Sequence, residues 1–86
     1  MTNRVKKILA TRRRAYGHPA AEFARVAAMW SIILNSKVTA AHVGLCMICV
    51  KLAREVHSHK QDNLVDLCGY SACVEELYRR KKGKQR

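Results

Sequence analysis

Residues 51–70, KLAREVHSHKQDNLVDLCGY, predict a helical hairpin with charged side chains on both arms. The polar run 58–61 separates two helix-forming segments, and a connection this short makes consecutive helices antiparallel neighbours. The last turns of the first arm then face the first turns of the second arm. We therefore expect Arg54 to lie close to Asp66, and Lys51 to reach the same level of the hairpin.

The helical pattern continues on both sides of this hairpin, without a strand signal or an internal repeat. Gly17 suits the left-handed residue that closes a helix, Pro19 suits a first helical turn, and Thr39 suits an N-cap. We expect helices over about residues 3–15, 19–34 and 40–57, and a fourth from Gln61 or Asp62 to about Arg80. The sequence thus predicts an all-α fold, a small antiparallel bundle of about four helices.

Two apolar segments are expected to supply the core. Within 19–34, apolar residues recur at spacings of three and four and form one stripe along a helix. The stripe consists of Phe23, Val26, Ala27, Trp30, Ile33 and Leu34. The segment 40–50 is apolar on nearly every side, which is typical of a helix at the centre of a bundle or in a subunit interface.

The four cysteines are expected to pack as small apolar side chains. Cys46 and Cys49 form a C-x-x-C pattern, but they lie inside a continuous apolar helix. Cys68 and Cys73 are five residues apart and diverge in direction on a helix. We therefore expect no zinc site. His42 is expected to lie in an interface or as a hydrogen-bonded histidine in the core.

Charge divides the chain into three parts. Residues 1–14 and 79–86 hold six basic residues each, whereas 15–78 holds five basic and six acidic residues, which gives the net charge of +11. We expect a basic amphipathic N-terminal helix over 1–15, a helical core domain over 16–78 and a basic C-terminal tail over 79–86. Basic ends attract polyanions without choosing among them, so nucleic acids and nucleotides are candidate partners.

The length and the apolar pattern predict the assembly and the location. A helical domain of 86 residues has little core, and we expect a homo-oligomer, a dimer, to bury more surface. The most apolar stretch, 38–50, is too short to span a bilayer and is interrupted by His42. No secretory signal is visible. We expect a cytoplasmic protein with reduced cysteines and no membrane partner.

The cluster of Lys51, Arg54, Asp62 and Asp66 has two interpretations. The two cations can bind phosphate, with Arg54 able to make forked contacts, and the two carboxylates can hold a hard divalent ion such as Mg²⁺. An ion-pair network that fixes the hairpin explains the same residues without a ligand. Both interpretations stay open, because a network and a site can coexist.

The spacing of these and other residues resembles a family of small uncharacterised phage and prophage proteins. The matching positions are Arg12, Tyr16-Gly17-His18-Pro19, Phe23, Ala27-Ala28-Met29-Trp30-Ser31, Thr39, Lys51-Leu52-Ala53-Arg54 and Asp62 through Gly69-Tyr70 to Ala72. The resemblance implies a phage protein acting in the host cytoplasm, with no settled activity. It marks as candidate ligand-binding residues Arg12, Tyr16, Lys51, Arg54, Asp62, Asp66 and Tyr70. Where the family has acidic residues before Tyr-Gly, this chain has Arg13-Arg14, so its arm is more basic.

A weaker similarity is to the all-helical nucleotide pyrophosphohydrolases, which surround Mg²⁺ with four carboxylates. Glu22, Glu55, Asp62 and Asp66 are the carboxylates this chain offers, but the Glu-x-x-Glu pair of those enzymes is missing. Our main hypothesis is a phage accessory protein that binds a nucleotide, a nucleic acid or a host protein, without catalysis or a cofactor. A Mg²⁺-dependent triphosphate pyrophosphohydrolase and nonspecific nucleic-acid binding by the basic ends are the alternatives.

Overall fold

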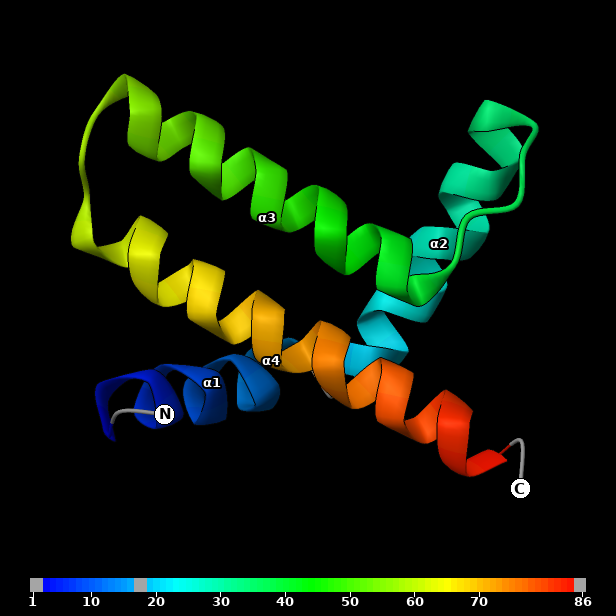
Figure 1. The fold of residues 1–86 in the computed structure, drawn as a ribbon, viewed down its shortest axis with the longest axis horizontal. Helices are drawn as coiled ribbons and strands as arrows, with labels where there is room; N and C mark the ends of the chain where they lie inside the picture. Colours follow the sequence, from blue (N-terminus) through cyan, green and yellow to red (C-terminus); the bar gives the residue numbers. More distant parts are fainter. Residues whose placement is uncertain (1–2, 17–18, 85–86) are drawn as a thin grey trace.

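The computed structural model describes residues 3–16 and 19–84, with side chains except at positions 5, 9, 12–16 and 81–84. All regular structure in these ranges is helical (Figure 1). The helices are α1 (Asn3–Tyr16), α2 (Pro19–Leu34), α3 (Ala40–His57) and α4 (Gln61–Lys84). The predicted all-α fold of about four helices is confirmed, while the predicted closure of the first helix at Gly17 lies outside the described residues.

The helix α4 lies between α3 and α1. It forms the predicted antiparallel hairpin with α3, and α1 packs along its other side (Figure 1). The helix α2 crosses the hairpin and contacts each of the other helices. Of the two positions expected for the apolar segment 40–50, the centre of the bundle is therefore wrong, because the described helices contact α3 on one side only. A subunit interface stays a prediction.

The connection between α2 and α3 is built from short polar side chains. Asn35 adopts a left-handed conformation with φ of 49°, which asparagine tolerates better than most residues. The Ser31 hydroxyl accepts a hydrogen bond from the Val38 backbone N–H at 2.9 Å. Together they turn the chain sharply, so that α3 begins beside the middle of α2.

A reciprocal cap begins α3. The Thr39 hydroxyl accepts from the His42 backbone N–H, and His42 Nδ1 accepts from the Thr39 backbone N–H, each at 3.2 Å. The N-cap prediction for Thr39 is confirmed. The expected core position of His42 is corrected, because its exposed ring caps the helix in the place that Glu or Gln usually takes. Its alternative position in an interface stays a prediction.

The core gathers where α2, α3 and α4 meet. Phe23, Ala27 and Val43 are buried together. Gly44 permits the close approach of the helices, because a Cβ atom there would lie 2.5 Å from Val74 Cγ2. Substituting a larger residue would force a side chain or a helix to move.

Part of the predicted apolar stripe is not in this core. Val26 and Trp30 pack against it, but Ile33 is 76% exposed and Leu34 is 62% exposed. The reason is the sharp connection after α2, which directs α3 away and leaves the last turn of α2 beyond its neighbours (Figure 1). The stripe therefore ends about one turn earlier than its spacing predicts.

The cysteine prediction is wrong for three positions of four. Cys46, Cys49 and Cys68 are exposed, whereas Cys73 is half-buried and packs against the core. Cys46 and Cys49 lie on the uncovered side of α3. An apolar sequence context gave no information about which side of the helix would be covered.

The helix α4 runs about one turn beyond the predicted end near Arg80. Two ion pairs at i,i+4 spacing stabilise the helix just before this extra turn: Arg79 with Glu75 at 2.9 Å and Arg80 with Glu76 at 3.0 Å. Such pairs add a few tenths of a kcal/mol each to helix stability, about 0.3–0.5. In the described part of the chain, no helix is both long and apolar enough to cross a membrane.

Candidate functional site

A buried ion pair joins the two arms of the hairpin. Lys51 Nζ lies 2.7 Å from Asp66 Oδ2, and their side chains are only 13% and 4% exposed. The expected level of Lys51 on the hairpin is thus confirmed. The expected pairing of Arg54 with Asp66 is wrong among the described residues, because Arg54 is one turn further along α3 and is exposed.

Glu55 closes the turn of the hairpin. Its Oε1 accepts hydrogen bonds from the Lys60 backbone N–H at 3.0 Å and from Asn63 Nδ2 at 3.2 Å. Its Oε2 pairs with the ring of His59. The His59 hydrogen bond, followed by that from Lys60, lowers the pKa of Glu55 below its ordinary value of 4.5. The carboxylate therefore binds the start of α4 to the end of α3.

Asn63 was not anticipated from the sequence. It is only 6% exposed, and its side-chain amide donates to Glu55 across the turn. An asparagine in the first turn of a helix is common on surfaces, and its distance of eight residues from Glu55 follows no helix period. No signal in the sequence distinguished it.

A pocket of about 570 Å³ opens beside this turn. Its lining residues are Ala53, Arg54, His57, Ser58, Lys60 and Asn63. Within the described residues, neither Arg54 nor Lys60 has a carboxylate at ion-pair distance. Since the neighbouring Lys51 is neutralised by Asp66, these two are the cations of the hairpin that can attract an anion.

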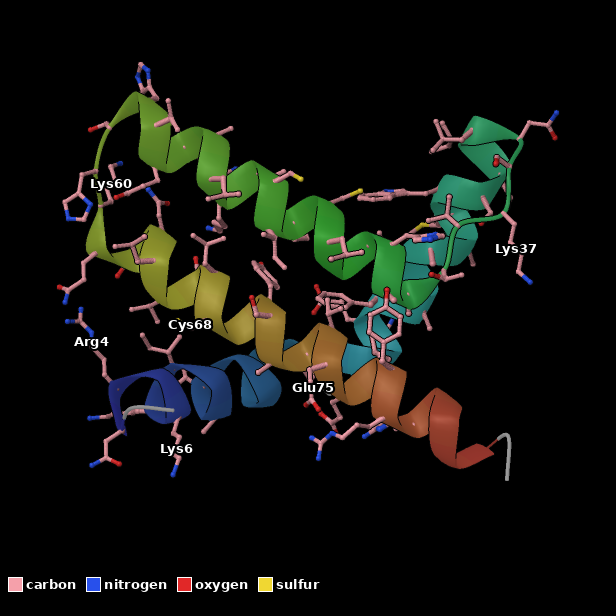
Figure 2. The ribbon with its side chains drawn as sticks, in the orientation of Figure 1. Arg4, Lys6, Lys37, Lys60, Cys68 and Glu75 are labelled. Carbon is pink, nitrogen blue, oxygen red and sulfur yellow. The ribbon has the colours of Figure 1, made fainter. Side chains whose placement is uncertain are left out.

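The N-terminal helix adds a further cation to this end of the molecule. Figure 2 shows Arg4 of α1 and Lys60 of the turn at the same end, while Lys37 lies at the opposite end. We call Arg4, Arg54 and Lys60 the cationic end. The last turns of α4 lie far from it (Figure 1), and Arg79 and Arg80 there pair with glutamates of the same helix. The two basic ends of the sequence thus differ in surroundings.

The other predicted site residues are distributed differently. Asp62 is exposed in the first turn of α4 and does not line the pocket. Tyr70 is half-buried, with its ring centroid 6.0 Å from that of Phe23, so it packs against the core. Arg12 and Tyr16 lie in α1, and their side chains are outside the described residues.

The carboxylates proposed to surround Mg²⁺ are not gathered. Across residues 3–16 and 19–84, no three histidine, cysteine, aspartate or glutamate side chains lie close enough together to hold a metal ion. Asp66 is paired with Lys51, and both oxygens of Glu55 have partners in the turn. Glu22 and Asp62 therefore do not complete a four-carboxylate set with them.

Comparison with known proteins gives two matches. A family model described as a domain of unknown function (DUF6378) matches residues 1–78. The Gene 55 protein of Mycobacterium phage D29 is 34% identical over 68 residues, which cover 78% of this chain and 45% of that protein. The chain thus aligns with less than half the length of this curated relative. No solved structure matches the chain.

Proposed function

The chain belongs to a family of phage proteins of unknown function (DUF6378), and from this premise we propose that its cationic end binds a phosphate-bearing ligand without turnover. The observation that carries the proposal is the contrast between neighbouring cations of the hairpin. Lys51 is neutralised by Asp66, whereas Arg54 and Lys60 line the pocket without a carboxylate partner among the described residues. A nucleotide or a nucleic acid supplies the anion that this arrangement suits.

Phosphate fits the chemistry of the pocket in two ways. The guanidinium of Arg54 can donate two parallel hydrogen bonds to a phosphate, and Lys60 offers a point charge. Arg4 at the same end extends the positive field to a longer polyanion (Figure 2).

Binding without turnover is supported by how the acidic side chains of the hairpin are used. Asp66 holds Lys51, and Glu55 holds Lys60, Asn63 and His59. A carboxylate engaged in this way stabilises the turn and is poorly placed to hold a metal ion or to accept a proton from water. The hairpin therefore suits a receptor for an anion better than a hydrolase.

The test is calorimetric titration with adenosine triphosphate, inorganic triphosphate and a short single-stranded oligonucleotide at low salt. We expect Arg54→Ala and Lys60→Ala to weaken binding by up to about fivefold each, as for exposed ion pairs. Lys37→Ala is the matched control, because Lys37 is also an exposed loop lysine but lies at the opposite end (Figure 2). It should leave the affinity unchanged.

Four outcomes would contradict the proposal. Absence of binding to all three probes at low salt would remove it. If Lys37→Ala lowers the affinity as much as Arg54→Ala and Lys60→Ala do, the net charge of the chain attracts the probe and no specific site exists. Release of phosphate or pyrophosphate in the presence of Mg²⁺ would favour the hydrolase. Oligonucleotide binding that is lost on deleting residues 79–86, but keeps its affinity in Lys60→Ala, would indicate that the basic tail is the binding site.

A further inference from the structure

The outward side of α3 carries an apolar stripe at the spacing of a coiled-coil seam. Leu45, Cys49, Leu52 and Val56 follow one another at intervals of four, three and four residues. This alternation keeps side chains on one side of a helix and repeats the a and d positions of a heptad. We call these four residues the outer stripe; it is about 16 Å long at the rise of an α-helix.

The outer stripe points away from the hairpin. The buried residues of α3 are Val43 and Gly44, and Met47 and Lys51 continue the same side toward α4. At 100° per residue, the stripe lies on roughly the opposite side of the helix. Leu45 is 43% exposed, Leu52 is 49% exposed and Val56 is 87% exposed. No helix of the described chain covers this side of α3 (Figure 1).

Exposed apolar side chains are concentrated on α2 and α3. Among the described residues, eight of the ten large apolar side chains that are exposed belong to these helices. They are Met29, Ile32, Ile33 and Leu34 on α2 and Leu45, Val50, Leu52 and Val56 on α3. A monomeric protein rarely leaves so many apolar side chains in one region, which is typical of a surface that another molecule covers.

Charge favours a second copy of this chain as the occupant. The segment Ala40–Val50 has no Asp, Glu, Lys or Arg, although the chain has a net charge of +11. Two copies repel one another through their basic ends and least through this neutral surface. Beside the seam, Cys46, Ile48 and Ala53 are uncharged, and the fourth flanking residue, Glu55, is already bonded to Lys60, Asn63 and His59 in the turn. A strongly charged partner would therefore find little complementary charge here.

Charge also decides the direction of pairing. The intervals of the outer stripe read the same in both directions, so an antiparallel partner places Val56 against Leu45 and Leu52 against Cys49. Parallel pairing would bring the Arg54 and Lys60 of both copies to the same end, where like charges repel. Antiparallel pairing separates the two cationic ends and also aligns the helix dipoles favourably.

We propose that two copies of this chain form an antiparallel, two-fold symmetric dimer through the outer stripes of α3. Each stripe then fills the spaces of the other in the manner of a coiled coil, as an isologous interface requires. A standard subunit interface takes about 800 Å² from each partner, about an eighth of the 6389 Å² surface of one chain.

The mass of the full chain in solution tests the dimer. Sedimentation should give twice the 9.8 kDa of one chain. Leu52→Glu and Val56→Glu should each raise the dissociation constant by about 100-fold or more, since each puts two buried charges into the interface. Leu64→Glu is the matched control. The exposed fraction of Leu64, 46%, is similar to that of Leu52, 49%, but Leu64 lies on α4 and not on the outer stripe. It should leave the dimer intact.

Circular dichroism of each variant separates dissociation from unfolding, and Val56 is already so exposed that glutamate there should leave the helices unchanged. A monomeric parent chain overturns the proposal, as does a dimer that Leu64→Glu alone dissociates. A parent chain that is monomeric alone but binds a host protein overturns the choice of a second copy as the occupant.

Cysteine cross-linking tests the direction of pairing. In a Cys46→Ala/Cys49→Ala background, a mixture of Leu45→Cys and Val56→Cys chains should form a disulfide, because antiparallel pairing brings these positions together. Each variant by itself should form no disulfide through its introduced cysteine. The reverse result, with each variant cross-linking to itself and not to the other, indicates parallel pairing and overturns the antiparallel arrangement.

Discussion

Lys51 and Arg54 lie one turn apart on α3, yet their surroundings are opposite. The side chain of Lys51 is only 13% exposed and is bonded to a carboxylate that is almost wholly buried, whereas Arg54 is exposed on the wall of a pocket. We call the buried Lys51–Asp66 pair the inner region of the hairpin, and the exposed pocket wall with Arg54 and Lys60 its outer region. The inner region has the surroundings of a protein interior, and the outer region has those of a ligand-binding surface. The comparison shows that the burial of a charged side chain and its ion-pair partner determine whether it stabilises the fold or is available to a ligand. The residue type alone does not determine this.

The two regions depend on one another. The Lys51–Asp66 pair joins α3 to α4, and the contact of Phe23 with Tyr70 joins α2 to α4. Glu55 then fixes the turn that carries Lys60. The pocket cations are therefore presented by a rigid support, which reduces the conformational entropy lost when a ligand binds.

The largest expected effect is in the inner region. Asp66→Ala removes the carboxylate and leaves the buried ammonium of Lys51 without its partner. Breaking a buried pair in this way costs about 3–5 kcal/mol. Urea denaturation followed by circular dichroism should show this loss. A change below about 1 kcal/mol would mean that the pair is solvated, and the contrast between the two regions would disappear.

A compensated variant sharpens this result. Lys51→Met/Asp66→Leu removes both charges and keeps apolar volume between the arms. We expect it to recover at least about half of the loss, since replacing a buried pair by apolar residues is often neutral. The same denaturation measurement gives the free energy of unfolding that the double variant recovers. A double variant less stable than Asp66→Ala would show that the charges contribute more than they cost to bury.

Glu55 lies at the boundary of the two regions, and its effect should be intermediate and dependent on pH. Because its pKa is lowered in the folded chain, its contribution is present above the ordinary value of 4.5 and is lost as the pH falls through the folded pKa. Glu55→Gln should therefore lower the melting temperature at neutral pH. It should also flatten the decline of the melting temperature between about pH 6 and pH 3. Parallel curves for the variant and the parent would contradict this assignment.

The smallest effect on stability is expected in the outer region. Arg54→Ala should change the free energy of unfolding by less than about 0.5 kcal/mol, because an exposed side chain without an ion-pair partner loses few interactions. The same variant should weaken binding of triphosphate. Comparing its denaturation curve with its titration separates the two properties. A stability loss as large as that of Asp66→Ala would place Arg54 in the supporting structure.

The helices were predictable because their determinants are local. Pro19 begins α2 and Thr39 caps α3, as the residue types indicate, and the polar run after His57 ends α3. The failures concern contacts between helices. His42 caps its own helix instead of packing elsewhere, and the end of the stripe at Ile33 and Leu34 is exposed.

The candidate site was predicted as a cluster and found as separate parts. The sequence placed Lys51, Arg54, Asp62 and Asp66 near one junction of two helices, and the hairpin has that junction. Only Lys51 and Asp66 meet among these four, while Arg54 lines the pocket and Asp62 is exposed outside it. Spacing along a helix gives the direction of a side chain to within a quarter turn, which is too coarse to choose between Lys51 and Arg54 as the partner of Asp66.

The sequence by itself determined the helices, their caps and the hairpin, because helix periodicity and capping act over a few residues. It also determined the distribution of charge along the chain. Only the tertiary structure decided which side of the apolar α3 is covered, which cation is neutralised, and that the N-terminal Arg4 lies at the end of the molecule where the hairpin turns. Those outcomes depend on how α4 packs between α1 and α3, and packing of this kind joins residues far apart in the chain.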